Sequence, residues 1–383
     1  MKIVLLTTDN REHFGDYSNP KPHFGTAPEA LLQGFALLPD EAEIHVVSCV
    51  RHPVSEPEML EPNIHYHRLL VPKIGWMRTL YQGCVRAVRK KLNQIQPDIV
   101  HGQGTEHDCA ISAVFSGFPN VLTIHGNMRL IAKVNRVKPF TFHWLAARLE
   151  TLTLPRSAGV VCITRYTEEA VRDLARRTWV LPNAVDGSYF DVDAQPRPEE
   201  PPKILCIGFV CHRKNQNRFI QALDALALKR RFNLVFLGEV RPENPYGAEF
   251  LRLVAARPWC KYAGFADRQT LKAHFREASL LALPSLEDNC PMAVLEAMAT
   301  GVPIVGARVG GVPDLIEEGV TGVFCDPVDS QSMCAAVDQA LTNSSGSREM
   351  ARNAKRYARE RFHPRVIARG HLEIYREVLR RFS

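Results

Sequence analysis

Short apolar segments alternate with amphipathic helical segments along almost the whole chain, and this alternation restricts the fold more than any other feature. Short runs rich in Val, Ile and Leu are typical of buried strands, whereas apolar residues at helical spacing indicate helices packed on a sheet. Such an order predicts an α/β fold with doubly wound parallel sheets. Because 383 residues exceed the size of one ordinary domain, we expect two.

The expected elements fall into two sets. In the first half we expect strands at residues 2–7, 43–49, 98–101, 120–125, 159–163 and 178–181, and helices at residues 27–38, 77–95, 107–116, 143–154 and 167–176. In the second half we expect strands at residues 203–208, 233–237, 260–262, 280–283 and 303–306, and helices at residues 217–227, 268–277, 291–298, 312–317, 330–342 and 348–361.

A proline-rich segment, residues 195–202, separates the two sets. Its prolines can continue neither a helix nor a central strand. We therefore expect an N-terminal Rossmann-like domain at residues 1–190, a linker at 191–202 and a second Rossmann-like domain from residue 203. Two such domains would face each other across a ligand-binding cleft at the carboxyl ends of their sheets.

Composition excludes several classes of protein. No apolar run approaches the roughly 20 residues of a membrane-spanning helix, and the first apolar run covers only residues 3–6, too few for a signal peptide. The ten cysteines form no C-x-x-C pair, so we expect reduced thiols in a cytoplasmic protein. Asp191 and Asp193 form a D-x-D pattern beside the linker, which we interpret as a solvated turn. No metal is expected.

A basic region extends over residues 62–149, which contain twelve Lys or Arg and only three acids. Within it, the expected helix at residues 77–95 has one apolar face and one basic face. The basic face is either ordinary solvated surface or a surface that meets anionic lipid or an anionic acceptor.

The segment PSLEDNCPMAVLEAM, residues 284–298, places a loop at the carboxyl end of an expected strand and a helix N-terminus directly after it. The N–H groups of Met292 and Ala293 together with the helix dipole would bind a phosphate. Glu296 is either a half-exposed helix residue or a carboxylate that accepts hydrogen bonds from a vicinal diol such as ribose.

Three further segments carry candidate residues. The loop after the expected strand at residues 203–208 contains Arg213 and Lys214, which would either neutralise a diphosphate or form a solvated basic turn. In the first half, the Gly25–Thr26 turn allows a phosphate to approach the backbone, and His125 either faces the cleft or is a core histidine. The motif HGQGTEH at residues 101–107 only approximates G-x-G-x-x-G, so nicotinamide binding gains little support.

These motifs resemble the retaining glycosyltransferases of family 4, which have the GT-B fold of two Rossmann-like domains. The similarity is densest over residues 284–327, and the segments LPNAVD, IGFVCHRKNQ, FGTAPE, TIHG, CITRYTEEAV and ARERFHPRVIARGHLEIYREVL also resemble that family. The resemblance implies a donor-binding domain at residues 203–364 and a C-terminal helix at about 365–383 that completes the acceptor-binding domain. It also implies a UDP- or GDP-linked sugar donor and a hydroxyl of a glycan, lipid-linked or small-molecule acceptor, with no nucleic acid or cofactor. The basic region at residues 62–149 adds the alternative of a peripheral contact with the inner face of an anionic membrane.

The resemblance also assigns roles to residues. Glu296 corresponds to the acid that contacts the ribose. Asp288, with its neighbour Glu287 as the alternative, corresponds to the acid that contacts the sugar. Lys214 corresponds to the lysine of the diphosphate loop. The arginine expected after Gly208 is replaced by Phe209, so Arg213 is a candidate substitute. The remaining assignments are His125 beside the reacting sugar, Gly25, Thr26 and Gly208 near the phosphates, and Ala266 within the base-binding loop at residues 264–267.

Alternatives follow from the two departures from the family pattern, Phe209 and Asp288. The chain is either an active transferase, in which a leaving-phosphate oxygen takes the acceptor proton, or a homologue with weakened catalysis. Another GT-B enzyme, such as a nucleotide-sugar epimerase, and a two-lobed solute-binding protein are the remaining alternatives.

Overall fold

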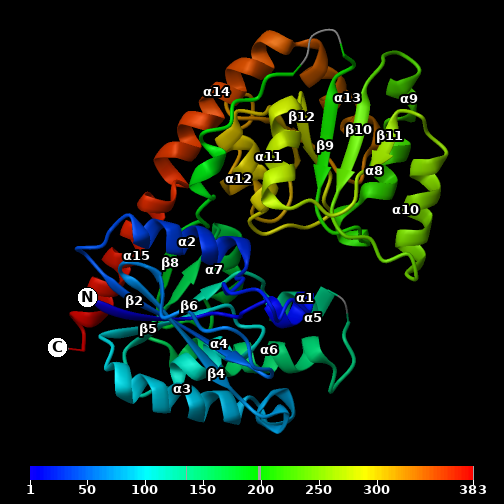
Figure 1. Ribbon diagram of the computed structural model, residues 1–383. Helices are drawn as coiled ribbons and strands as arrows, with labels where there is room; N and C mark the ends of the chain where they lie inside the picture. Colours follow the sequence, from blue (N-terminus) through cyan, green and yellow to red (C-terminus); the bar gives the residue numbers. More distant parts are fainter. Residues whose placement is uncertain (135, 197–199, 383) are drawn as a thin grey trace. The chain divides into compact units, whose positions relative to one another are not determined.

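The computed structural model describes residues 1–134, 136–196 and 200–382, which form two compact units (Figure 1). The first unit contains Met1–Ala184 and the C-terminal segment from His363, and the second contains Val185–Phe362. The first boundary therefore falls before the expected linker at 191–202, of which residues 197–199 lie outside the described residues. Within the described parts of the chain, no helix is long and apolar enough to cross a bilayer.

The first unit is built on one sheet with strand order β3-β4-β2-β1-β5-β6-β7-β8. All neighbouring strands pair in parallel except β3, which is antiparallel to β4. The strands are β1 (Lys2–Leu6), β2 (Glu43–Val50), β3 (Met59–Glu61), β4 (Ile64–Leu70), β5 (Ile99–Gln103), β6 (Asn120–Ile124), β7 (Val160–Cys162) and β8 (Thr178–Val180). The α-helices are α1 (Arg11–Phe14), α2 (Thr26–Ala36), α3 (Gln82–Ile95), α4 (Asp108–Val114), α5 (Met128–Val134), α6 (Phe142–Thr153), α7 (Arg165–Val171) and α15 (Pro364–Leu379).

Alternating side chains of each strand fill the two faces of this sheet, as the period of a strand requires. Ile3 and Leu5 of β1 belong to a buried cluster with residues of α2 and α15, whereas Val4 and Leu6 belong to a cluster with residues of α3 and α4. The helix α15 lies beside α2 although the two are far apart in sequence (Figure 1). The C-terminal helix is therefore part of the core of the first unit.

The second unit contains a parallel sheet with strand order β11-β10-β9-β12-β13-β14. Its strands are β9 (Lys203–Ile207), β10 (Asn233–Leu237), β11 (Cys260–Tyr262), β12 (Leu280–Leu283), β13 (Ile304–Ala307) and β14 (Val323–Cys325). Its α-helices are α8 (Gln216–Ala222), α9 (Asp224–Ala227), α10 (Pro245–Ala255), α11 (Arg268–Glu277), α12 (Met292–Thr300), α13 (Ser330–Thr342) and α14 (Ser344–Arg361). The strand order reverses between β9 and β12, and ligands bind at such switch points, outside the carboxyl ends of the strands.

The doubly wound α/β architecture agrees with the sequence prediction, but several elements differ. The helix expected at residues 77–95 begins only at Gln82, because Leu80 and Tyr81 adopt positive φ values of 51° and 59° and end the preceding 3₁₀ turns. The strand β4, with sequence IHYHRLL, was not predicted because His and Arg interrupt its apolar residues. The elements β3, α5, α10 and β14 were also not predicted.

Gly34 provides a test of the contact between α2 and α15. A Cβ atom at Gly34 would lie 2.1 Å from the carbonyl oxygen of Pro364, so Gly34→Ala should force the two helices apart. We expect a net loss of about 1–3 kcal/mol in the free energy of unfolding of the first unit, measured by urea denaturation. Gly25→Ala is the control, because its Cβ atom would meet only Pro28 at an ordinary 3.6 Å. Equal stability of the two variants would contradict this packing.

Candidate active site

Two loops meet at the switch point of the second sheet, one after β9 and one after β12. The backbone N–H of Leu286 donates a hydrogen bond to the carbonyl of Arg213 at 2.8 Å. The side-chain amide of Asn215 donates to the carbonyls of Pro284, at 3.1 Å, and Pro327, at 2.8 Å. Asn215 has a φ of 60° and ends the 3₁₀ turn His212–Lys214. These bonds fix the basic turn against the loop that carries the acids.

Asp288 holds both cations of the basic turn. Its Oδ2 lies 2.6 Å from Lys214 Nζ and its Oδ1 lies 3.3 Å from Arg213 Nη1. The hydroxyl of Ser285 donates to Oδ2 at 3.1 Å. Asp288 is buried, with a relative exposure of 6%. A single buried carboxylate therefore positions two cations at the carboxyl ends of the strands.

Two glycines allow this arrangement. A Cβ atom at Gly310, whose φ is 53°, would lie 2.0 Å from the carbonyl oxygen of Asp288. That same carbonyl accepts a hydrogen bond from the N–H of Gly311 at 3.0 Å. Gly208, with a φ of 145°, lies beneath the side chain of Lys214, since a Cβ atom there would be 3.4 Å from Lys214 Cε. A larger residue at Gly310 would displace the backbone of Asp288, and a larger residue at Gly208 would strain the backbone because of the positive φ.

Glu287 has weaker contacts than its neighbour. Its carboxylate lies 3.5 Å from Arg213 Nη1, and that nitrogen donates to the carbonyl of Glu287 at 2.9 Å. Partial burial raises the pKa of Glu287, and the Arg213 guanidinium opposes this shift. The structure thus brings the four predicted residues together, Arg213, Lys214, Glu287 and Asp288, with Asp288 as the acid that binds Lys214.

Glu296 is buried on α12, with a relative exposure of 5%, so the interpretation as a half-exposed helix residue is wrong. The hydroxyl of Tyr189 donates a hydrogen bond to its carboxylate, and Arg268 lies near enough to interact electrostatically. Arg268 itself forms a 2.9 Å ion pair with Asp186. Burial dominates these effects and raises the pKa of Glu296 to about 7.

Helix α12 begins where the acidic loop ends. Pro291 is its N-cap residue, and Met292 and Ala293 are its first two residues. The positive end of the helix dipole therefore lies at the carboxyl edge of the sheet, as the sequence indicated. Such an N-terminus favours an anion.

Phe209 occupies the position at which the resemblance expects an arginine. Its side chain is 38% exposed, and the guanidinium carbon of Arg241 lies 5.3 Å from its ring centroid. Arg241 belongs to the loop after β10, the next strand of the sheet. A guanidinium is therefore present beside Phe209, although it comes from another loop.

The loop after β11 contains Ala266, which is half-buried. Asp267 accepts a hydrogen bond from the N–H of Thr270 at 2.8 Å and so caps α11. This loop lies at the same carboxyl edge of the sheet as the loops after β9 and β12, because the three strands are parallel. The role of Ala266 in base binding stays a prediction.

In the first unit, His125 directly follows β6 and is half-buried. Its Nε2 donates to Oε1 of Gln103 at 2.8 Å, and the side chain of Asn183 also forms a hydrogen bond with it. Burial lowers the pKa of His125 to about 4, so the imidazole is neutral near pH 7. His125 is thus a positioned neutral histidine at the carboxyl edge of the first sheet.

The Gly25–Thr26 turn forms the start of α2, with Gly25 as the N-cap residue. Gly25 has a φ of −69°, which any residue can adopt, and a Cβ atom would meet only Pro28 Cδ at 3.6 Å. The fold itself therefore does not require glycine at this position. A requirement for glycine would come from a ligand that approaches the backbone.

Sequence reasoning missed several residues that support the predicted ones. Ser285 and Asn215 lie inside predicted motifs, and their polar side chains next to the acids and cations were a usable signal. Gln103 belongs to the HGQG segment that was discounted as a nicotinamide motif. Tyr189 and Arg268 reach Glu296 from elements far away in sequence, so no local signal identifies them.

The match to known families covers both units. Residues 36–189 match the model described as Glycosyltransferase Family 4, and residues 190–361 match the model described as Glycosyl transferases group 1. Together with the two parallel sheets, these matches place the chain among the glycosyltransferases of GT-B fold. Within that class, the chain belongs to family 4.

Individual relatives are distant. An uncharacterised glycosyltransferase from Methanocaldococcus jannaschii is 23% identical over 243 residues, which is 60% of this chain and 62% of that protein. The sucrose-phosphate synthase of Thermosynechococcus elongatus has a TM-score of 0.77 at 19% identity and covers 100% of both chains. The Anabaena protein HepE, solved in complex with UDP and glucose, has a TM-score of 0.72 at 18% identity over 98% of this chain and 100% of HepE. These structures establish the common fold.

Glu296 makes stability depend on pH in a specific direction. Because its pKa rises from 4.5 to about 7, the folded protein keeps a proton on Glu296 that the unfolded chain releases in this range. The stability that this bound proton contributes is fully present below the pKa of Glu296 in the unfolded chain. It is lost as the pH rises through the pKa of Glu296 in the folded protein. The free energy of unfolding of Glu296→Gln relative to wild type should therefore increase by up to about 3 kcal/mol as the pH rises from about 5 to about 8, measured by urea unfolding.

Glu349→Gln is the matched control, because Glu349 is an exposed glutamate of the same unit. Its stability relative to wild type should stay constant over this pH range. A pH-independent difference for Glu296→Gln would show that Glu296 ionises normally in the folded protein.

Proposed function

We propose that this chain is a retaining transferase that moves a hexosyl group from a nucleoside diphosphate sugar to a hydroxyl acceptor, without a metal ion. The observation that carries the proposal is the pair of cations, Arg213 and Lys214, positioned by Asp288 at the switch point of the second sheet. The same loop leads into the N-terminus of α12. Cationic side chains and a helix N-terminus are groups that bind phosphates.

A UDP-linked or GDP-linked sugar is the donor class that these groups favour. The complex of HepE with UDP and glucose supports a uridine nucleotide, since HepE shares the fold of this chain. Glu296 would accept hydrogen bonds from the ribose hydroxyls, and the loop that contains Ala266 would contact the base. In the first unit, Gly25 and Thr26 would approach the phosphates.

The reaction breaks the bond between the anomeric carbon and the diphosphate oxygen and forms a bond to the acceptor oxygen on the same face. Lys214, Arg213 and the N-terminus of α12 would stabilise the negative charge that develops on the leaving diphosphate. A phosphate oxygen would take the proton of the acceptor hydroxyl. His125, neutral at pH 7, would hydrogen-bond to a sugar hydroxyl, and Asp288 or Glu287 would bind further hydroxyls.

The acceptor is a glycan, a lipid-linked sugar or a small molecule, and a cytoplasmic location with peripheral membrane contact stays a prediction. The apolar side chains of Ile74 and Leu80, which are 75% and 45% exposed, lie in the 3₁₀ region before the basic helix α3 and are compatible with such a contact. The second candidate function is that of a weakened homologue. Phe209 at the expected arginine position is the observation that favours it.

Loss of the Lys214 charge should reduce turnover more than substrate binding. Lys214→Ala removes an ammonium that stabilises the leaving diphosphate, so kcat should fall by about 10²-fold or more in an assay of sugar transfer or donor hydrolysis. The assay uses the donor that raises the thermal unfolding midpoint most within a panel of UDP- and GDP-sugars. Arg241→Ala should cause a smaller loss, because its side chain is 59% exposed.

Lys229→Ala, which removes an exposed lysine of the same unit, should leave kcat unchanged. Near-normal turnover of Lys214→Ala would refute the proposed role of Lys214. A wild-type protein that binds no donor in the panel would instead support the weakened homologue.

Asp288 and Glu287 should differ sharply on substitution. Asp288→Asn removes the carboxylate that binds Lys214, so we expect a loss of about 10²-fold in kcat, whereas Glu287→Gln should lose less than about threefold. The reason is that Asp288 is buried and contacts both cations, whereas the Glu287 side chain is 36% exposed. Steady-state kinetics of both variants measures the two losses in kcat. A larger loss for Glu287→Gln would reverse the assignment of the two acids.

A further inference from the structure

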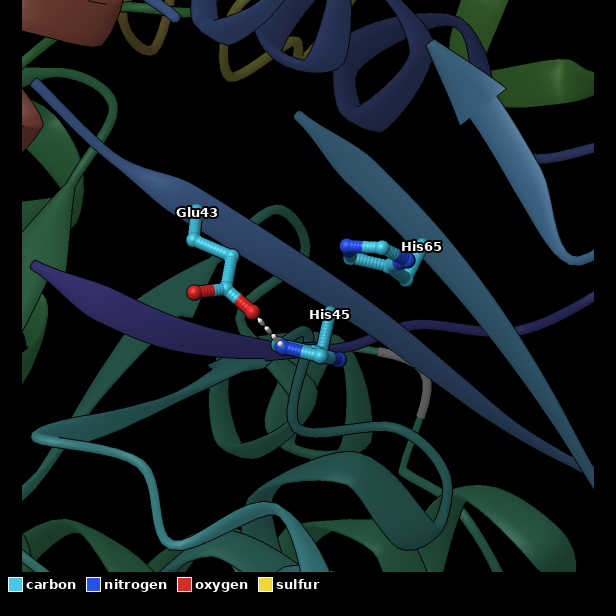
Figure 2. A group of neighbouring side chains, drawn as sticks. All are labelled: Glu43, His45 and His65. Atoms are coloured by element: carbon cyan, nitrogen blue, oxygen red, sulfur yellow. Dashed lines mark hydrogen bonds and ion pairs between the residues drawn. The ribbon is translucent and has the colours of Figure 1, made fainter. Parts of the chain in front are cut away.

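Three potential metal ligands lie together on the first sheet, away from the residues assigned to sugar transfer. Glu43 and His45 belong to β2, and His65 belongs to β4 (Figure 2). Each residue offers one ligand atom, and the three atoms lie within 4.8 Å of one another. We propose that Glu43, His45 and His65 bind a divalent transition-metal ion, with Zn²⁺ as the best fit. This proposal does not rest on the proposed transferase function.

The register of the strands explains why these side chains meet. His45 lies directly opposite His65 in the parallel pair β2–β4, and Glu43 precedes His45 by two residues. All three side chains therefore point to the same face of the sheet. The imidazole rings of His45 and His65 stack with centroids 4.8 Å apart (Figure 2). The sheet thus brings the three side chains together before any ion binds.

The ligand atoms, which lie within 4.8 Å of one another, must converge further to bind one ion. Oε1 of Glu43 and Nε2 of His45 are 2.8 Å apart and share a hydrogen bond. Ligand atoms of a tetrahedral zinc ion lie about 3.3 Å from one another, because the bonds to nitrogen and oxygen are about 2.0–2.2 Å long. Rotation of the His45 and His65 side chains out of their stacked arrangement would direct the ligand lone pairs of Glu43, His45 and His65 toward one ion. Water would complete the coordination.

A fourth histidine supports His45 as a ligand. Nδ1 of His45 lies 2.9 Å from Nε2 of His67, which is on the same face of β4. If Nε2 of His45 binds a metal, its proton must lie on Nδ1, where it can be donated to Nε2 of His67. Both rings stay neutral and only change tautomer. A ligating histidine commonly donates its second N–H in this way.

The chemistry of the ligands selects the metal. Two imidazole nitrogens and one carboxylate suit Zn²⁺ and its neighbours, whereas Mg²⁺ and Ca²⁺ require mainly oxygen ligands. The negative charge of Glu43 is offset in part by Lys2, which pairs with it in register on β1, and Lys91 lies near His67. Because the cluster has little net negative charge, binding of the metal ion depends on the imidazole nitrogens.

The site is accessible and lies at the amino-terminal edge of the sheet. The Glu43 side chain is 47% exposed, His65 is half-buried, and both lie at the start of their strands. Gly25 and His125 lie at the opposite, carboxyl-terminal edge, since they follow β1 and β6. A metal here would join β2 to β4 and stabilise the unit without contacting those residues.

Another group of potential ligands among the described residues, Cys49, Cys84 and Asp108, has a different environment. All three residues are buried. Solvent water, which would complete the coordination of an ion, has little access to them. We therefore assign the metal to the cluster of Glu43, His45 and His65, of which the Glu43 side chain is exposed.

The test is calorimetric titration of the tag-free, chelator-treated full chain with Zn²⁺, and with Mg²⁺ in a parallel experiment. We expect one high-affinity Zn²⁺ per chain, a higher midpoint of thermal unfolding with Zn²⁺, and no comparable effect of Mg²⁺. Co²⁺ in place of Zn²⁺ should give visible absorption typical of nitrogen and oxygen ligands. Removal of the ion should leave sugar transfer unchanged.

Variants test whether Zn²⁺ binds to this cluster rather than to other histidines of the chain. Glu43→Gln and His65→Gln affect exposed or half-buried side chains and should fold, and each should weaken Zn²⁺ binding by about 10²-fold or more. His67→Ala should weaken it by about tenfold, because His67 orients His45 rather than binding the ion. His143→Gln, at an exposed histidine of the same unit, should have no effect. Absence of stoichiometric binding, or unchanged binding in both ligand variants, would overturn the proposal.

Discussion

The ion pair between Lys214 and Asp288 joins the loops after β9 and β12, the two strands between which the order of the second sheet reverses. The exposed fractions of the two side chains are only 14% and 9%. Removal of one partner from such a pair leaves an uncompensated charge and costs about 3–5 kcal/mol. Together with the backbone bond between Leu286 and Arg213 and the bonds of Asn215, this contact positions the basic turn and the acidic loop that leads into α12.

The parts of this arrangement that depend on local patterns could be predicted. Strand-loop-helix patterns placed Lys214 and the acidic loop at the carboxyl edge of one sheet, whereas the choice of Asp288 over Glu287 as the acid that contacts the sugar came from the resemblance to family 4. In the structure Asp288 pairs with Lys214, and its contact with a sugar stays a prediction. Contacts that require distant elements to pack could not be predicted. The environment of Glu296 depends on Tyr189 and Arg268, which only the folded chain brings to α12.

Two carboxylates of one short segment have different surroundings. Asp288 contacts two cations, whereas Glu296 is buried with a tyrosine hydroxyl and a more distant guanidinium, so burial raises its pKa to about 7. Hydrogen bonds donated by a ligand's hydroxyls would stabilise the ionised form of Glu296. Binding of a diol at this residue would therefore be coupled to release of a proton near neutral pH. The sequence, which shows only a glutamate in an apolar helix, contains no sign of this raised pKa.

The same alternation of side chains that builds the first sheet also creates the histidine cluster. Ile44 and Val46 of β2 and Ile64 and Tyr66 of β4 fill the core with α2 and α15. The intervening residues, His45, His65 and His67, must then point to the face that α3 covers. The helix α3 ends at Ile95, whose carbonyl accepts a hydrogen bond from the side chain of Lys2. The histidines interrupt the apolar residues of β4, so the sequence did not predict this strand. The register of β2 and β4 brings His45 and His65 together as the proposed metal ligands.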